Sequence, residues 1–152
     1  MVTVMATGTF DLLHIGHIYY LKEAKKLGDT LAVVVACDKT VRRLKHEPVT
    51  TEEMRLKLIT ELRVVDEAVL GSEDDKFEVV EKLKPDVIAL GYDQIHDEKS
   101  LKQELKKRDI SARVVRLPKY DCASDLDGTR RIIAKIIEAY GFQKEMEKIE
   151  KE

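Results

Sequence analysis

The chain has 152 residues, a length that favours one domain built around a single hydrophobic core. Hydrophobic residues make up 43% of the chain and charged residues 37%, and this apolar share excludes a disordered protein. Its 27 Lys and Arg residues and 29 Asp and Glu residues give a formal net charge of -2. That balance argues against a broad basic surface for nucleic acid and leaves room only for a local basic pocket.

Nothing in the chain predicts passage through a membrane or export. No run of about 18 apolar residues is present. The first residues carry neither the basic segment nor the cleavage site of a secretion signal, so we expect a cytoplasmic protein. Cys37 and Cys122 predict neither a disulfide framework nor a zinc site. Cys122 lies in a predicted loop, where it is either a reactive thiol or incidental.

The first third of the chain predicts strand, turn, helix, strand. Residues 3–6 are prone to β-structure and lead into a glycine. Apolar residues then recur at helical spacing over 16–27, until Gly28 ends the helix. Residues 30–36 form an almost unbroken apolar run, which is typical of a central parallel strand buried on both faces.

The same alternation continues through the rest of the chain. A short basic helix is predicted over 40–45, and a longer one over 52–63, capped by Thr50 or Thr51 with Glu53 closing a capping box back to Thr50. The remaining strands are expected at 64–70, 86–90 and 112–117, and the remaining helices at 77–83, at 100–107 and along an isoleucine stripe over 132–137.

Alternating strands and helices of these lengths predict an α/β protein with a Rossmann-like, doubly wound sheet. We expect five mainly parallel strands with helices on both faces. Residues 1–141 would form this domain, and residues 142–152 a charged helical tail. Ligands of such sheets bind at the carboxyl ends of the strands.

The stretch from Thr7 to His17 joins the first strand to the first helix and carries the strongest chemical signal. A glycine-rich turn before a helix offers backbone N–H groups and the positive end of the helix dipole, which together suit a phosphate. His14 and His17 add side-chain donors, and Gly16 would let a phosphate approach the backbone. The simpler alternative is that the histidines are solvated or cap the helix. A zinc site would need further ligands, and the stretch is not a Walker A motif.

The stretch Gly8-Thr9-Phe10-Asp11-x-Leu13-His14-x-Gly16-His17 resembles the signature of the nucleotidyltransferase superfamily of cytidylyltransferases and adenylyltransferases. Two small families within it are similar to this chain, glycerol-3-phosphate cytidylyltransferase and the short archaeal FAD synthase. The segment from Leu83 to Gln94 favours the FAD synthase, with the Asp93-Gln94 pair as the discriminating feature.

The resemblance implies transfer of AMP from ATP to FMN, giving FAD and pyrophosphate. The alternative is transfer of CMP from CTP to a small phosphoalcohol such as glycerol 3-phosphate, and the sequence does not encode the base preference. A non-catalytic nucleotide-binding module is a third interpretation. A triphosphate substrate implies Mg²⁺ or another divalent cation, and we expect no metal ligands from the protein. By resemblance we also expect a homodimer.

The resemblance also implies roles for particular residues. His14, His17 and Lys45 would act on the phosphates, although Lys45 could equally be a solvated surface charge. Asp93 would bind the ribose or simply belong to a turn, and Asp11 would contact the metal's outer sphere or brace its own turn. Nucleotide contacts are further expected from Thr9, Phe10, Ile15, Gly16 and Thr129, phosphate or substrate contacts from Arg55, Arg63 and Lys119, and a flavin shelf from Tyr19, Tyr20, Tyr92 or Tyr120.

Two positions depart from the superfamily pattern. The late signature is usually rich in Ser and Thr, but here only Thr129 keeps a hydroxyl and Gly128 stands in place of its partner. Lys119 follows Leu-Pro where the cytidylyltransferases have Arg, so the charge is kept but the bidentate fork is lost.

Overall fold

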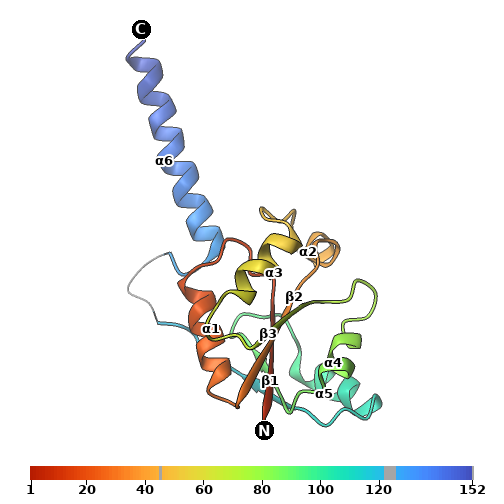
Figure 1. The fold of residues 1–152 in the computed structure, drawn as a ribbon. Helices are drawn as coiled ribbons and strands as arrows, with labels where there is room; N and C mark the ends of the chain where they lie inside the picture. Colours follow the sequence, from red (N-terminus) through yellow and green to blue (C-terminus); the bar gives the residue numbers. More distant parts are fainter. Residues whose placement is uncertain (45, 122–125, 152) are drawn as a thin grey trace.

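A computed structural model describes residues 1–44, 46–121 and 126–151, and its elements follow the predicted alternation (Figure 1). In chain order they are β1 (Thr3–Gly8), α1 (Ile15–Lys25), β2 (Thr30–Val35), α2 (Asp38–Leu44), α3 (Glu52–Thr60), β3 (Glu67–Leu70), α4 (Glu78–Leu83), β4 (Val87–Leu90), α5 (Glu98–Lys107), β5 (Arg113–Arg116) and α6 (Thr129–Ile149).

The strands form one five-stranded sheet in the order β3-β2-β1-β4-β5. Every pairing in it is parallel, which confirms the predicted Rossmann-like sheet. The chain builds outward from β1 in one direction through β2 and β3, then returns to add β4 and β5 on the other side. The winding therefore reverses between β1 and β4, and the crevice that binds ligands in such folds lies at their carboxyl ends.

Helices cover both faces of the sheet. Successive residues of β1 point to opposite faces, and each face packs against its own helices. Val4 packs on one side with Leu21 of α1 and Ile59 of α3. Met5 packs on the other side with Leu105 of α5 and with side chains of α4. Figure 1 shows α1 and α3 on one side of the strands and α4 and α5 on the other, so the predicted double winding is confirmed.

Two local predictions need correction at the ends of elements. The strand expected from residue 64 begins only at Glu67, because residues 62–65 form a turn in which the N–H of Val65 donates to the carbonyl of Leu62. Thr51 caps α3 through its hydroxyl, but the predicted capping box is wrong. The N–H of Thr50, which that box would give to Glu53, donates to Asp11 instead.

The last helix, α6, extends away from the body of the molecule, and none of its residues is buried (Figure 1). It runs without a break through residues 141 and 142, where the predicted boundary between domain and tail falls. Among the described residues, no helix combines the length and the apolar character needed to cross a bilayer.

Candidate active site

The first loop, residues 9–14, connects the carboxyl end of β1 to α1 and has an unusual backbone. Phe10 and Leu12 adopt positive φ angles of 56° and 49°, a conformation that side chains disfavour and that clusters at functional sites. The Phe10 ring is buried and meets the edge of the His17 ring at 5.4 Å between centroids. Gly8 makes room for it, because a Cβ there would lie 2.8 Å from the Phe10 ring. Packing of Phe10 thus fixes the loop.

His14 and His17 cap α1 through each other. His14 is the N-cap residue, and its Nδ1 accepts the N–H of Gly16 at 3.1 Å. His17, three residues on, accepts the N–H of His14 on its own Nδ1 at 3.3 Å. The pair therefore replaces the Ser and Glu of an ordinary capping box. The two rings are stacked, with 3.7 Å between their centroids, so both lie on one side of the helix start.

This arrangement fixes where each imidazole carries its proton. A nitrogen that accepts a hydrogen bond cannot hold a proton, so each neutral ring is protonated on Nε2, the atom farther from the backbone. Partial burial lowers the pKa of His14, although the nearby charges of Asp127 and Asp93 work in the opposite direction. His14 is therefore neutral at pH 7 and presents an N–H donor. An N–H donor beside a helix N-terminus suits a phosphate oxygen.

The start of α6 approaches the first loop from the far end of the sequence. The hydroxyl of Thr129 donates to the carbonyl of Asp11 at 2.8 Å. A Cβ on Gly16 would lie 2.4 Å from the carbonyl oxygen of Asp127, so glycine is needed there for this contact and not only for a phosphate. Arg131 pairs with the Asp127 carboxylate at 3.0 Å, which offsets its negative charge near the histidines.

Asp11 braces the first loop against the segment before α3. Its carboxylate is buried and accepts the N–H of Val49 at 2.7 Å and the N–H and hydroxyl of Thr50 at 3.0 and 2.6 Å. Burial alone would raise the pKa of Asp11, but these hydrogen bonds and the charge of Arg55 outweigh it and lower the pKa below its ordinary value. Of the two roles open to Asp11, the geometry favours the brace.

Arg55 is fully buried below the same loop. Its guanidinium donates to the carbonyl oxygens of Thr9 at 2.9 Å and Ala36 at 2.7 Å, and it also bonds Thr50 and pairs with the Asp38 carboxylate. With these four bonds to the protein, Arg55 acts here as a support for the carboxyl ends of β1 and β2. A phosphate could reach it only by displacing these contacts.

The carboxyl ends of β4 and β5 supply the other side of the crevice. Asp93 is exposed, and its charge acts on His14. Tyr92 is 49% exposed, and the Lys119 ammonium lies 5.8 Å from the centre of its ring. The Tyr19 and Tyr120 rings lie 4.5 Å apart, which brings the segment after β5 against α1. Asp93 and Lys119 thus lie at the edge where the histidines are.

Other predicted site residues lie elsewhere or outside the described part of the chain. Arg63 is exposed in the turn that leads into the amino-terminal end of β3, at the opposite edge of the sheet from His14, and its predicted phosphate contact stays a prediction. Lys45 and Cys122 fall outside the described residues. Ile15 is the first residue of α1 and is exposed.

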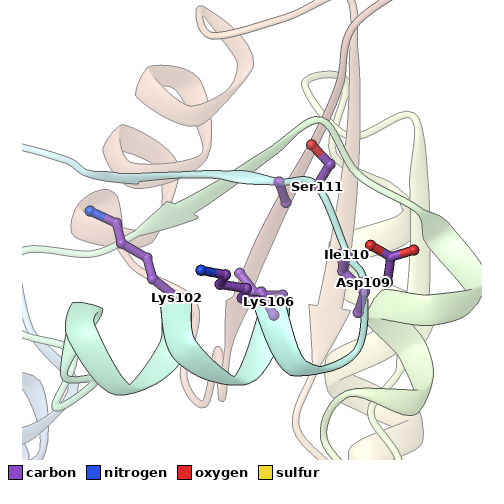
Figure 2. A pocket seen from close by; sticks show the side chains of 7 residues that line it. Lys102, Lys106, Asp109, Ile110 and Ser111 are labelled. Carbon is purple, nitrogen blue, oxygen red and sulfur yellow. The ribbon is translucent and has the colours of Figure 1, made fainter.

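The described residues contain no group of three or more His, Cys, Asp or Glu side chains arranged to hold a metal ion. A groove of about 300 Å³ lies on α5, lined by residues that include Lys102, Lys106 and Ser111 (Figure 2). Figure 2 shows the two lysines rising from α5 beside the segment that carries Ser111. This segment precedes β5, so the groove is at the amino-terminal edge and separate from the crevice.

Comparisons with known proteins identify the family. A family model described as Cytidylyltransferase-like matches residues 5–140. A curated FAD synthase of Aciduliprofundum boonei is 56% identical over 138 residues, covering 91% of this chain and 92% of the relative. A second FAD synthase, from Methanothermus fervidus, is 56% identical over 135 residues, covering 87% and 92%.

Solved structures place the fold in the same group. A crystal structure titled as a lipopolysaccharide core biosynthesis protein from Thermoplasma volcanium is 55% identical, with a TM-score of 0.78, and covers 80% of this chain and 99% of that one. A pantoate-beta-alanine ligase from Francisella tularensis shares only the fold, at 17% identity and a TM-score of 0.57, over 82% of this chain and 61% of that one. The chain belongs to the cytidylyltransferase-like family of nucleotidyltransferases and, within it, to the FAD synthases.

Proposed function

We propose that this protein transfers AMP from ATP to FMN, forming FAD and releasing pyrophosphate. The observation that carries the proposal is the pair of stacked imidazoles at the start of α1, in a chain that is 56% identical to FAD synthases. Their Nδ1 atoms accept backbone N–H groups, which directs the Nε2–H groups of both rings to serve as the donors to phosphate oxygens in this proposal.

The reaction joins an oxygen of the FMN phosphate to the α-phosphorus of ATP and breaks the bond to the β-phosphate oxygen. Pyrophosphate leaves in line with the attack and carries away the electron pair. Because the attacking phosphate is already an anion at neutral pH, no strong general base is required. The barrier comes from the approach of one anion to another, so catalysis depends on positioning and on donors aimed at the developing negative charge.

In this assignment His14 and His17 hold the α- and β-phosphates. Thr9 and the backbone of Phe10, Ile15 and Gly16 contact the same phosphates, and Asp93 accepts hydrogen bonds from the ribose. Lys45 and Lys119 contribute positive charge, and Thr129 contacts the nucleotide from the start of α6, which requires its hydroxyl to leave the carbonyl of Asp11. Asp11 and Arg55 support the loop that carries these groups, because their polar atoms are bonded to protein.

A divalent cation enters with ATP in this proposal. The described residues offer no cluster of metal ligands, and the Asp11 carboxylate is occupied by Val49 and Thr50. Mg²⁺ suits such a site because it keeps several waters and binds through substrate phosphates. The protein's part is then to orient the triphosphate, while the cation neutralises phosphate charge.

Incubation with ATP, FMN and Mg²⁺ tests the proposal directly. FAD fluoresces much less than FMN, so we expect flavin emission to fall while pyrophosphate accumulates. Turnover only with CTP and glycerol 3-phosphate would assign the chain to the cytidylyltransferase alternative. Nucleotide binding without pyrophosphate release from any acceptor would assign it to a non-catalytic module.

We also propose that the protein is a homodimer, an expectation that comes from the family resemblance. The exposed apolar side chains of α6, among them Ile137, Tyr140 and Phe142, are compatible with pairing of two copies through this helix. Light scattering with size-exclusion chromatography tests this. A mass near 17.4 kDa, that of one chain, would contradict the dimer.

A further inference from the structure

Between β1 and β4, at the point where the sheet opens into the crevice, two side chains take the place of backbone pairing. The register of the two strands runs from Val4 opposite Val87 to Ala6 opposite Ala89. Beyond that pair, Tyr20 and Gln94 enter between the strands.

Tyr20 forms the first bridge. Its hydroxyl accepts the N–H of Thr7 at 3.2 Å and lies 2.8 Å from the carbonyl oxygen of Ala89, to which it donates. Burial raises the pKa of Tyr20 well above its ordinary value, so the hydroxyl keeps its proton. Tyr20 belongs to α1, two turns after His14, so this bridge also ties the helix that carries the histidines to both strands.

Gln94 forms the second bridge. Its amide Nε2 donates to the carbonyl of Thr7 at 2.6 Å, and its Oε1 accepts the N–H of Gly91 at 3.1 Å. All four polar positions of the gap are thus satisfied by side chains: the N–H and C=O of Thr7, the C=O of Ala89 and the N–H of Gly91. A backbone polar group left unpaired in such a gap would be costly, so both side chains are needed to satisfy it. We call Tyr20 and Gln94 together the wedge.

We infer that Tyr20 and Gln94 are positioning residues that hold the carboxyl ends of β1 and β4 apart and so set the place of Asp93 relative to His14. Asp93 directly precedes Gln94, and the histidines sit on the helix that Tyr20 anchors. The wedge therefore fixes the separation between the ribose side and the phosphate side of the crevice. This inference rests on the proposed function, because it assumes that one nucleotide spans both sides.

The role of the wedge predicts different effects on the affinities for ATP and for tripolyphosphate. ATP contacts both sides of the crevice, whereas tripolyphosphate contacts only the histidine side. Loss of the wedge should therefore weaken ATP and spare tripolyphosphate. A variant that merely damaged the fold would weaken both.

Calorimetric titration with Mg-ATP and with Mg-tripolyphosphate tests this without FMN. We expect Gln94→Leu to raise the Kd for ATP by roughly tenfold, the worth of about one to two hydrogen bonds, with tripolyphosphate unchanged within about twofold. Tyr20→Phe removes one hydroxyl, is the milder change for folding, and should show the same selectivity. Gln103→Leu, at an exposed glutamine of α5, is the matched control and should change neither ligand.

Unchanged ATP affinity in both variants, or equal weakening of both ligands, would overturn the inference and leave the proposed function intact. A wild-type protein that binds ATP but makes no FAD would contradict the proposed function. The change in Kd for ATP, compared with that for tripolyphosphate, would still decide the role of the wedge. A wild-type protein that binds neither ligand would remove both.

Discussion

The two ring nitrogens of His14 have different roles, one observed and one proposed, and substitutions can separate them. Its Nδ1 accepts the N–H of Gly16 and caps α1, and its Nε2–H is the proposed phosphate donor. The Oδ1 of asparagine lies where Nδ1 lies, so His14→Asn keeps the cap and removes the donor. The amide of glutamine reaches the Nε2 position, so His14→Gln keeps a donor and removes the cap.

The structure sets the size of each effect. Loss of an N-cap acceptor costs about 1 kcal/mol of stability, which corresponds to a decrease of roughly 2–4 °C in Tm for a chain of this size. Only one of the two capping bonds is lost, because the N–H of His14 still donates to His17 in either variant. Loss of a donor aimed at the developing charge costs about a hundredfold or more in kcat.

Two assays read these effects independently. Thermal unfolding followed by circular dichroism should place His14→Asn near the wild type and His14→Gln below it. Flavin fluorescence with ATP and FMN should reverse that order, with His14→Asn the less active variant. Wild-type kcat in His14→Asn, or activities of the two variants that simply follow their stabilities, would refute the two roles of His14.

The remaining predictions concern pH, close packing and buried charge. The folded-state pKa of His14 lies below its unfolded value of about 6.5, so the unfolded chain takes up a proton first as the pH falls and the folded state loses stability. Urea unfolding at pH 8 and pH 5.5 should therefore show a larger decrease in the free energy of unfolding for the wild type than for His14→Asn. Equal decreases would contradict this. Gly16→Ala should weaken ATP binding, because its Cβ would lie 2.4 Å from the carbonyl oxygen of Asp127. Gly128→Ala should leave ATP binding unchanged, because its Cβ would meet nothing within 4 Å. Calorimetric titration with ATP compares the two variants. Arg55→Met should lower the free energy of unfolding by about 3 kcal/mol or more, because it removes a fully buried charge from its partners. Arg63→Met, at an exposed position, should lower it by less than about 0.5 kcal/mol. Chemical denaturation measures both, and similar losses would show that burial of Arg55 does not explain the destabilisation.

The sheet could be predicted because its strands are continuous apolar runs. Residues Thr30–Val35 are buried at every position but the first, as a central parallel strand requires. The histidines could be located because Gly8 and Gly16 mark a turn that opens a helix. Their reciprocal capping could not be predicted, because histidine is not an ordinary capping residue and the orientation of its ring depends on packing against Phe10.

Arg55 shows why the other contacts of the site could not be predicted from the sequence. A helical arginine is nearly always exposed, and sequence alone gives no sign that this one is buried. Its burial depends on carbonyl oxygens of Thr9 and Ala36, which meet only when β1, β2 and α3 come together. In the same way Gln94 marked the family in the sequence, but its contact with Thr7, 87 residues away, belongs to the tertiary structure.

The most direct test of the central claim is a crystal structure of the protein with Mg²⁺ and a non-hydrolysable ATP analogue. We expect phosphate oxygens at about 3 Å from the Nε2 atoms of both His14 and His17, with their Nδ1 atoms still bonded to the backbone. A triphosphate bound away from these rings, or rings turned so that Nδ1 faces the phosphates, would contradict it.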